Sequence, residues 1–303
     1  MKNLSLRQLQ VFDAVAESAN YSAASERLGI TQPAVSMLMR QLEADAGVAL
    51  TVRQGRRMDL TAAGTTLLRH ARAILEQTRL ADEALASLVS GRSGHLHLGV
   101  VSTANYFAPR LLMEFQRSVP GVSFKLSVAR RDEILAMLKD HRIDVAIAGH
   151  PPGEAEVEAE TFARNPHCIV AAPAHPLAGK RRIPWSRLRS QPFIFREAGS
   201  ATRQFLEHLL LSKALKVNVT IELAGNETVK QAVMAGMGIS FLSAHAVQVE
   251  LQARRMAVLD VADMPKWLDW CLLHRRDSQL GGLSAAFREF VLAQGRTVAA
   301  CRL

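Results

Sequence analysis

The chain has 303 residues, 49% of them hydrophobic, which is enough for two or three domains with buried cores. Its formal net charge of +9 favours a negatively charged partner without identifying one. No apolar run reaches the roughly 18 residues of a membrane-spanning helix, and no secretory signal is recognisable, so we expect a cytoplasmic protein without membrane contact. The cysteines are too widely spaced to suggest a disulfide framework or a zinc site.

Residues 1 to 60 predict a helix-turn-helix. Ser5 and Gln8 form a capping box for a first amphipathic helix, and a second helix begins near Ser22. Gly29 then supplies a turn. Thr31 caps a third helix, whose first turn tolerates Pro33 because the missing N–H would have no intrahelical partner there.

The third helix has two different sides. At 100° per residue, Val35, Leu38 and Leu42 fall on the side that faces the core. The opposite side carries Gln32, Ser36, Met39 and Glu43, with Arg40 alongside. A free polar side of this kind can enter the major groove of double-stranded DNA, where Gln pairs with adenine and Ser reaches a base or a phosphate. The alternative is a small helical bundle without such a role.

Two further segments continue this unit. The stretch after Gly47 alternates apolar and polar residues around Gln54 and Gly55, which predicts a two-stranded wing carrying Arg53, Arg56 and Arg57, three candidate phosphate ligands. Residues 61–90 then predict one long helix. Its apolar positions follow the spacing of a coiled-coil seam: Leu67, Ala71, Ile74, Thr78, Ala81, Leu85 and Leu88. We therefore expect a dimer through residues 61–90, the alternative being that this helix packs on its own chain.

Residues 91–303 predict a two-lobed α/β domain behind a linker at 90–94. Strands at 95–101, 122–128 and 143–149 alternate with helices at 109–119 and 132–139, which indicates a βαβαβ start for a parallel sheet. A second series of alternating strands and helices opens near 167 and continues to 243. We expect the first lobe at about 91–163 and 267–303, and the second at about 164–266.

Three segments of this domain have the form of an anion site, in which a strand leads into the N-terminus of a helix. The candidate residues are Ser102, Thr103 and Asn105 in the first segment, Arg196, Ser200, Thr202 and Arg203 in the second, and Thr228 in the third. If the three segments face one another across a cleft between the lobes, they should bind a small anionic metabolite. Otherwise each Ser or Thr simply caps its helix.

The segment "AASERLGITQPAVSMLMRQLE" and the wing ending in "DLTAAG" resemble the LysR-type transcriptional regulators, over the whole chain. The segments "STANYFAPRLL", "NPH", "HPLA" and "REAGSATR" resemble the CbbR-type branch, which controls the operons of carbon dioxide fixation that encode RuBisCO. The resemblance implies a winged helix-turn-helix, a linker helix and an effector domain like the periplasmic binding proteins. It also implies a homodimer that assembles into a homotetramer, binds an interrupted inverted repeat in a promoter and works with RNA polymerase.

The resemblance also assigns residues. Gln32, Pro33 and Ser36 would meet bases, and Arg53 and Arg56 would meet phosphates. Ser102, Thr103, His150, Ser200, Thr202 and Arg203 would meet the effector, for which this branch suggests NADPH or phosphorylated intermediates of carbon fixation; no other cofactor is implied. The chain departs from the family pattern at Thr51, where phenylalanine is usual, at Ala198 and Ala201, and at His150, where arginine is expected.

Three other functions are open to a chain of this kind. It could be a LysR-type regulator of a different operon. A solute receptor would suit paired lobes with a cleft, but it would need an export signal and would have no use for residues 1 to 60. An enzyme would need a nucleophile with its base, a metal cluster or a phosphate loop, and we find none in the sequence.

Overall fold

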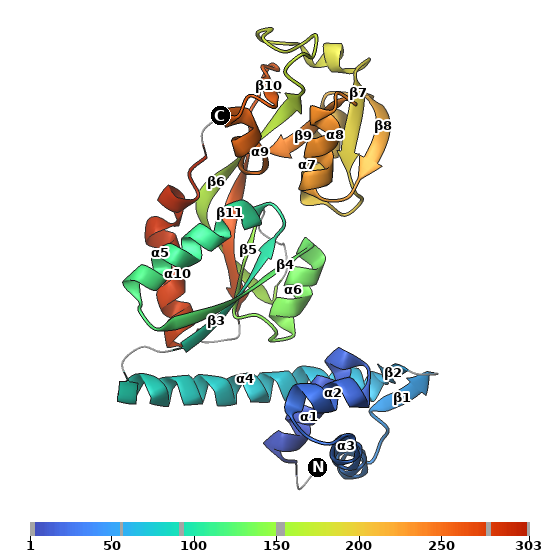
Figure 1. The fold of residues 1–303 in the computed structure, drawn as a ribbon, viewed down its shortest axis with the longest axis vertical. Coiled ribbons are helices and arrows are strands. Elements are labelled where there is room, and N and C mark those ends of the chain that lie inside the picture. Colours follow the sequence, from blue (N-terminus) through green and yellow to red (C-terminus); the bar gives the residue numbers. More distant parts are fainter. Residues whose placement is uncertain (1–3, 55–56, 91–93, 150–154, 277–279, 302–303) are drawn as a thin grey trace. The chain divides into compact units, whose positions relative to one another are not determined.

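The computed structural model describes residues 4–54, 57–90, 94–149, 155–276 and 280–301. Its first unit opens with the three helices α1 (Leu6–Ser18), α2 (Tyr21–Leu28) and α3 (Gln32–Ala46) (Figure 1). Ser5 and Gln8 form the expected capping box of α1, and Gly29 ends α2 with a left-handed φ of 63°. Thr31 caps α3 by accepting a hydrogen bond of 3.4 Å from the Ala34 N–H. The helix-turn-helix is confirmed, and Gly29 fits its turn because glycine adopts positive φ without steric cost.

The core of this unit corrects the assignment of the sides of α3. Val35 and Leu42 are fully buried as expected, but Met39 is 1% exposed and belongs to the same core. Met39 lies at the edge between the two sides of the helix, and a long flexible apolar side chain there gains free energy by turning inward. Glu43 does not lie free either, since its Oε1 accepts hydrogen bonds from the N–H groups of Leu50 and Thr51, at 2.8 and 3.0 Å.

The wing and the long helix follow directly. Strands β1 (Thr51–Gln54) and β2 (Arg57–Leu60) pair antiparallel, and α4 spans Ala62–Ser90. The first turns of α4 pack on its own chain, because Leu68 and Ala71 are buried in the core of the helix-turn-helix. Ala71 is therefore not available for the expected seam. Further along α4, the side chains of Ile74 and Leu85 are 41% and 62% exposed.

The second unit is a mixed α/β domain. Its first lobe contains β3 (Gly94–Val101), β4 (Val122–Ala129) and β5 (Val145–Ala148), with α5 (Ala108–Ser118) and α6 (Arg131–Lys139) between them (Figure 1). The strands β4 and β5 both pair parallel with β3, which confirms the βαβαβ start. The helix α10 (Gly282–Val298), near the end of the chain, also packs on this lobe.

The second lobe repeats the pattern. It contains β7 (Pro192–Arg196), β8 (Asn218–Leu223) and β9 (Ile239–Ser243), with α7 (Ala201–Ser212) and α8 (Asn226–Met234) between them and α9 (Ala244–Gln252) and β10 (Ala257–Leu259) after them. The strand β7 pairs parallel with both β8 and β9. The sequence did not lead us to expect α9 or β10.

Two long strands connect the lobes. In the described part of the chain the strand order is β4-β3-β5-β11-β6-β9-β7-β8, with β10 beside β6. Strand β6 spans Val157–Ala171 and β11 spans Lys266–Arg275, and they pair antiparallel with each other. The strand near 167, expected to open a second parallel series, is thus the end of β6 and is antiparallel to β9.

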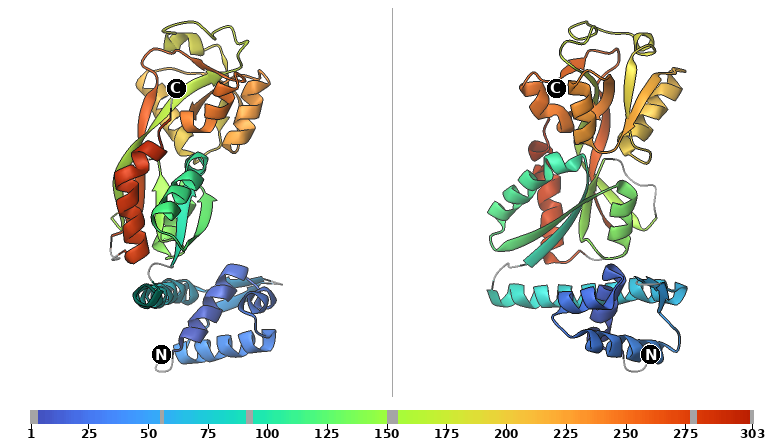
Figure 2. Two further views of the ribbon diagram at one scale, coloured as in Figure 1. Left: turned by 60° about the vertical axis from the view of Figure 1, so that its left-hand side comes forward. Right: turned by 45° about the vertical axis from the view of Figure 1, so that its right-hand side comes forward.

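Helices cover both faces of the sheet in each lobe, as the views in Figure 2 show. Along β5, Val145 and Ile147 face the core under α5 and α10, whereas Ala146 and Ala148 face the core under α6. This alternation follows from the two-residue period of a strand. No described helix is long and apolar enough to cross a membrane.

Candidate functional site

The exposed side of α3 carries three of the residues expected to contact DNA. Gln32 and Arg40 are exposed and Ser36 is half-buried. The Arg40 Nε donates a hydrogen bond of 3.3 Å to the Ser36 carbonyl, so this guanidinium lies along the helix. Thr31 and Pro33 are exposed at the start of the same helix.

A groove joins α3 to the wing. Gln32 and Arg53 line it together with Met58 and the start of α2, at Asn20, Tyr21 and Ser22. We did not predict the α2 residues. The signal was present, since Asn20 is a cap residue whose Oδ1 accepts a hydrogen bond of 2.7 Å from the Ser22 N–H, and helix N-termini attract anions.

Two of the three arginines expected in the wing lie within the described residues. Arg53 on β1 is exposed, and Arg57 on β2 is exposed and forms an ion pair with Asp59, with 2.9 Å between Nε and Oδ1. Arg56 lies outside the described residues. Thr51, which departs from the family pattern, donates from its hydroxyl to Glu43 Oε1 at 3.2 Å and so ties the wing to α3.

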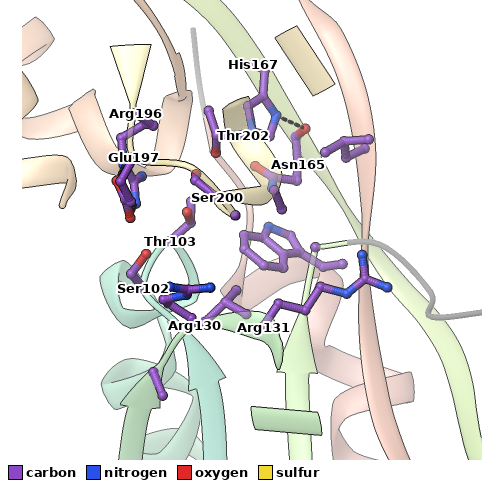
Figure 3. Close-up of a pocket in the computed structure, with 17 residues that line it drawn as sticks. Ser102, Thr103, Arg130, Arg131, Asn165, His167, Arg196, Glu197, Ser200 and Thr202 are labelled. Carbon is purple, nitrogen blue, oxygen red and sulfur yellow. Dashed lines mark hydrogen bonds and ion pairs between the residues drawn. The ribbon is translucent and has the colours of Figure 1, made fainter. Parts of the chain in front are cut away.

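A cavity lies between the two lobes of the second unit and includes about 540 Å³ of empty space, part of it open to solvent. Four of the predicted effector residues line it through their hydroxyl-bearing side chains (Figure 3): Ser102, Thr103, Ser200 and Thr202. Ser102 and Thr103 follow β3, whereas Ser200 and Thr202 belong to the start of α7. The tertiary structure therefore brings two segments about 100 residues apart in the sequence to one cavity.

None of these four hydroxyl groups forms a hydrogen bond with any residue that the structure describes. Ser200 occupies the N-cap position of α7, yet its side chain does not cap the helix. Thr103 and Thr202 are only 8% and 6% exposed, but neither hydroxyl is fully buried, so both are accessible to solvent in the cavity. The first N–H groups of a helix have no intrahelical acceptor either. The cavity thus presents hydrogen-bond donors without protein partners.

Arg196 lines the cavity, but its charge is already paired. It donates two hydrogen bonds of 2.7 Å to the two carboxylate oxygens of Glu197, and Nη1 donates to Asn226 Oδ1. Although burial opposes ionisation, the hydrogen bonds from Arg196 hold the pKa of Glu197 below its usual range. Glu197, its sequence neighbour, therefore offsets the positive charge of Arg196 at the cavity, and an effector contact by Arg196 stays a prediction.

The first lobe contributes two arginine side chains to the lining of the cavity. Arg130 and Arg131, which we did not predict, line the cavity from the junction of β4 and α6. Arg130 forms an ion pair of 2.9 Å with Asp132, while Arg131 has no partner among the described residues. A Cβ on Gly199 would lie 2.8 Å from Arg130 Nη2, so glycine leaves the room in which this guanidinium approaches the second lobe. The signal in the sequence was two arginines directly after a strand and at the start of a helix.

The floor of the cavity is a buried polar network that the sequence did not reveal. Asn165 and His167 from β6 line the cavity beside Trp270 from β11. Asn165 Oδ1 accepts a hydrogen bond of 2.7 Å from the Ser243 hydroxyl, and the Trp270 Nε1–H donates to His245 Nε2 at 3.1 Å. Burial lowers the pKa of both His167 and His245 to about 4. Both imidazoles are therefore neutral near pH 7.

Other predicted effector residues lie elsewhere. Asn105 and Thr228 are exposed and do not line the cavity. Arg203 also stays outside it, because its guanidinium pairs with Glu207 and Glu222, at 2.8 and 2.5 Å. His150 lies outside the described residues. Within the described ranges, no group of three His, Cys, Asp or Glu side chains could hold a metal ion.

Both units of the chain match known protein families. Residues 6–65 match the model for bacterial regulatory helix-turn-helix proteins of the LysR family, and residues 90–296 match the LysR substrate binding domain. A RuBisCO operon transcriptional regulator of Allochromatium vinosum is 42% identical over 99% of both chains. The HTH-type transcriptional regulator CbbR of Rhodospirillum rubrum is 44% identical over 96% of this chain and 97% of its own.

A solved structure is also similar. The regulatory domain of CcmR from Synechocystis PCC6803 in complex with 2-PG has a TM-score of 0.63 and 36% identity, covering 66% of this chain and 97% of its own. A winged helix-turn-helix followed by a two-lobed domain with a polar cavity defines a ligand-responsive regulator of transcription. The chain belongs to the LysR family of these regulators.

Proposed function

We propose that this protein regulates the genes of carbon dioxide fixation, including those of RuBisCO, and that a small anionic metabolite in the interlobe cavity modulates its DNA binding. The observation that carries the gene assignment is identity of 42 and 44% to regulators named for this role, over nearly the full length of each chain. We further propose that the protein acts in the cytoplasm and has no enzymatic activity.

The DNA-binding side of the proposal uses the exposed side of α3. Gln32 and Ser36 meet base edges in the major groove, with Thr31, Pro33 and Arg40 beside them. Arg53, Arg56 and Arg57 meet phosphates, which fixes the register of the protein on an interrupted inverted repeat and makes binding depend on salt. The groove that joins Gln32 to Arg53 supports this division of roles.

The proposed effector site uses the cavity hydroxyls that form no hydrogen bond with the described residues. Ser102, Thr103, Ser200 and Thr202 donate to the anion together with the first N–H groups of α7. Arg131, which forms no ion pair with a described residue, supplies positive charge, whereas Arg130 and Arg196 each pair with a nearby carboxylate. The similar CcmR regulatory domain, solved in complex with 2-PG, supports a small ligand in this domain. We keep NADPH and phosphorylated intermediates as further candidates.

The response to the effector follows from linkage. We propose a dimer through α4, whose Ile74 and Leu85 are exposed in the single chain, and a homotetramer of two such dimers that contacts RNA polymerase. An effector that prefers one geometry of the cavity shifts this assembly toward it and changes the bend of the bound DNA. A coupling of about 1–3 kcal/mol suffices.

The test is footprinting of the DNA upstream of the RuBisCO genes with the full-length protein, with and without 2-PG and NADPH. We expect a footprint whose length or bend changes with one of these ligands, and which is lost in Gln32→Ala. A control variant, Gln204→Ala, changes an exposed Gln away from α3 and should leave the footprint intact. A sequence-specific footprint on another promoter alone would point to a LysR-type regulator of a different operon.

A further inference from the structure

One apolar side chain stands on the side of α3 that faces away from the core. Met37 is 56% exposed, whereas Met39, two residues on, is 1% exposed. The residues next to Met37 on the helical surface are Pro33, Ala34, Arg40 and Gln41; Ala34 is half-buried and the other three are exposed. Met37 is therefore the one large apolar side chain exposed on α3, and it lies beside the charged Arg40 and the polar Gln41.

The position of Met37 on the helix places it among the residues proposed to meet DNA. At 100° per residue, Met37 lies 100° from Ser36 and 60° from Arg40, on the side opposite the buried Val35 and Leu42. When the N-terminal part of α3 lies in the major groove, a side chain in this direction reaches the base-pair edges as Ser36 does. Met37 offers no useful donor there, so it cannot read the hydrogen-bonding pattern.

The major groove contains one apolar group that such a side chain can recognise. Thymine carries a C5 methyl group at the groove edge, and cytosine, guanine and adenine have none. Resting on the protein's proposed DNA binding, we propose that Met37 packs against a thymine methyl group and so determines specificity for thymine at one position of each half-site. The flexible thioether side chain suits this contact because it adapts its rotamer to the methyl group.

Uracil-substituted DNA tests this contact, because deoxyuridine differs from thymidine by that methyl group alone. The preferred site is first selected from random DNA with the full-length protein, and each T of a half-site is then replaced in turn by U. We expect one replacement to weaken binding by the wild type about fourfold, the loss expected for one buried methyl group. In Met37→Ala the same replacement should have no effect.

Two further variants separate this contact from folding and from phosphate binding. Met113→Ala removes a Met that is 52% exposed on α5 in the other unit, and it should respond to U as the wild type does. Met37→Gln should lose the preference for T while its affinity keeps the wild-type dependence on salt, because no phosphate contact is removed.

Either of two results would overturn the inference about Met37 and leave the proposed function intact. In the first, no U replacement weakens wild-type binding; in the second, the same weakening persists in Met37→Ala. Absence of any preferred site for the wild type would instead refute the proposed function, and the Met37 contact with it.

Discussion

The Tyr106 hydroxyl donates a hydrogen bond of 2.6 Å to Glu227 Oε1, and the two residues belong to different lobes. Lys230, which is 4% exposed, lies 2.8 Å from the same carboxylate and 5.1 Å from the centre of the Tyr106 ring. Although burial opposes ionisation, hydrogen bonds from Lys230 and Tyr106 hold the pKa of Glu227 below its usual range. Tyr106 therefore joins the lobes through a charged acceptor.

Tyr106→Phe should weaken effector binding. The variant keeps the ring over Lys230 and removes only the hydrogen bond between the lobes, which should contribute about 1.5 kcal/mol to closure of the cavity because its acceptor is charged. We expect the affinity for 2-PG to fall about tenfold, measured by titration calorimetry on the full chain. Tyr21→Phe changes the other tyrosine of the chain, in the first unit, and should leave this affinity unchanged. Equal affinities of wild type and Tyr106→Phe would show that the bond does not favour the bound geometry.

Ser200→Ala should separate ligand binding from stability. The Ser200 hydroxyl has no hydrogen bond to the described residues, so its removal should change the free energy of unfolding by less than about 0.5 kcal/mol. Affinity for 2-PG should fall about tenfold, since a bond to an anion is worth about 1.5 kcal/mol or more. Ser212→Ala, at the other end of α7, removes a hydroxyl bonded to Leu209 O and serves as the control. A loss of stability equal to the loss of affinity would assign Ser200 a structural role.

Gly64→Ala should destabilise the DNA-binding unit. A Cβ at Gly64 would lie 2.0 Å from the carbonyl oxygen of Leu50, so α4 would have to move away from the wing. We expect a loss of about 2 kcal/mol, as for other overpacked sites. All three tryptophans lie beyond residue 184, so the measurement is amide hydrogen exchange of α1 to α3. Gly282→Ala, where nothing lies within 4 Å of the added Cβ, should leave these rates unchanged. Wild-type exchange rates in Gly64→Ala would contradict the close approach.

Acid should destabilise the effector domain before its carboxylates titrate. His167 and His245 have pKa values of about 4 in the fold, against 6.5 when unfolded, so the unfolded chain binds more protons between these limits. The free energy of unfolding should be highest above pH 6.5 and fall as the pH approaches 4, by about 3 kcal/mol for each histidine.

Tryptophan fluorescence during urea unfolding at pH 7 and pH 5 measures this loss, because all three tryptophans lie in the effector domain. His245→Gln keeps an acceptor for the Trp270 N–H and removes one titrating group, so its stability should depend less on pH than that of the wild type. An equal slope in both proteins would rule out His245 as a source of the effect.

The sequence by itself determined the elements and the DNA-binding motif. Gly29, Thr31 and the Ser5–Gln8 capping box are local signals, because a turn or a cap depends on residues within one helical turn of it. The regular alternation of strands and helices likewise predicted the parallel parts of the sheet. Met39 was misplaced because its position at the edge between the two sides of α3 allows either direction, and only the packing of the core decides.

Only the tertiary structure decided which residues share the cavity. Ser102 and Ser200 line the same cavity because the two lobes face each other, and no local sequence pattern predicts which residues of the two lobes lie close together. Arg196 and Arg203 looked equally suitable in the sequence, but Glu197 neutralises one and Glu207 and Glu222 hold the other away. Arg130 and Arg131 line the cavity instead, since the carboxyl end of β4 opens onto it, and of these two only Arg131 forms no ion pair with a described residue. Side-chain periodicity is local, whereas the net charge of a site is a sum over residues that only folding assembles.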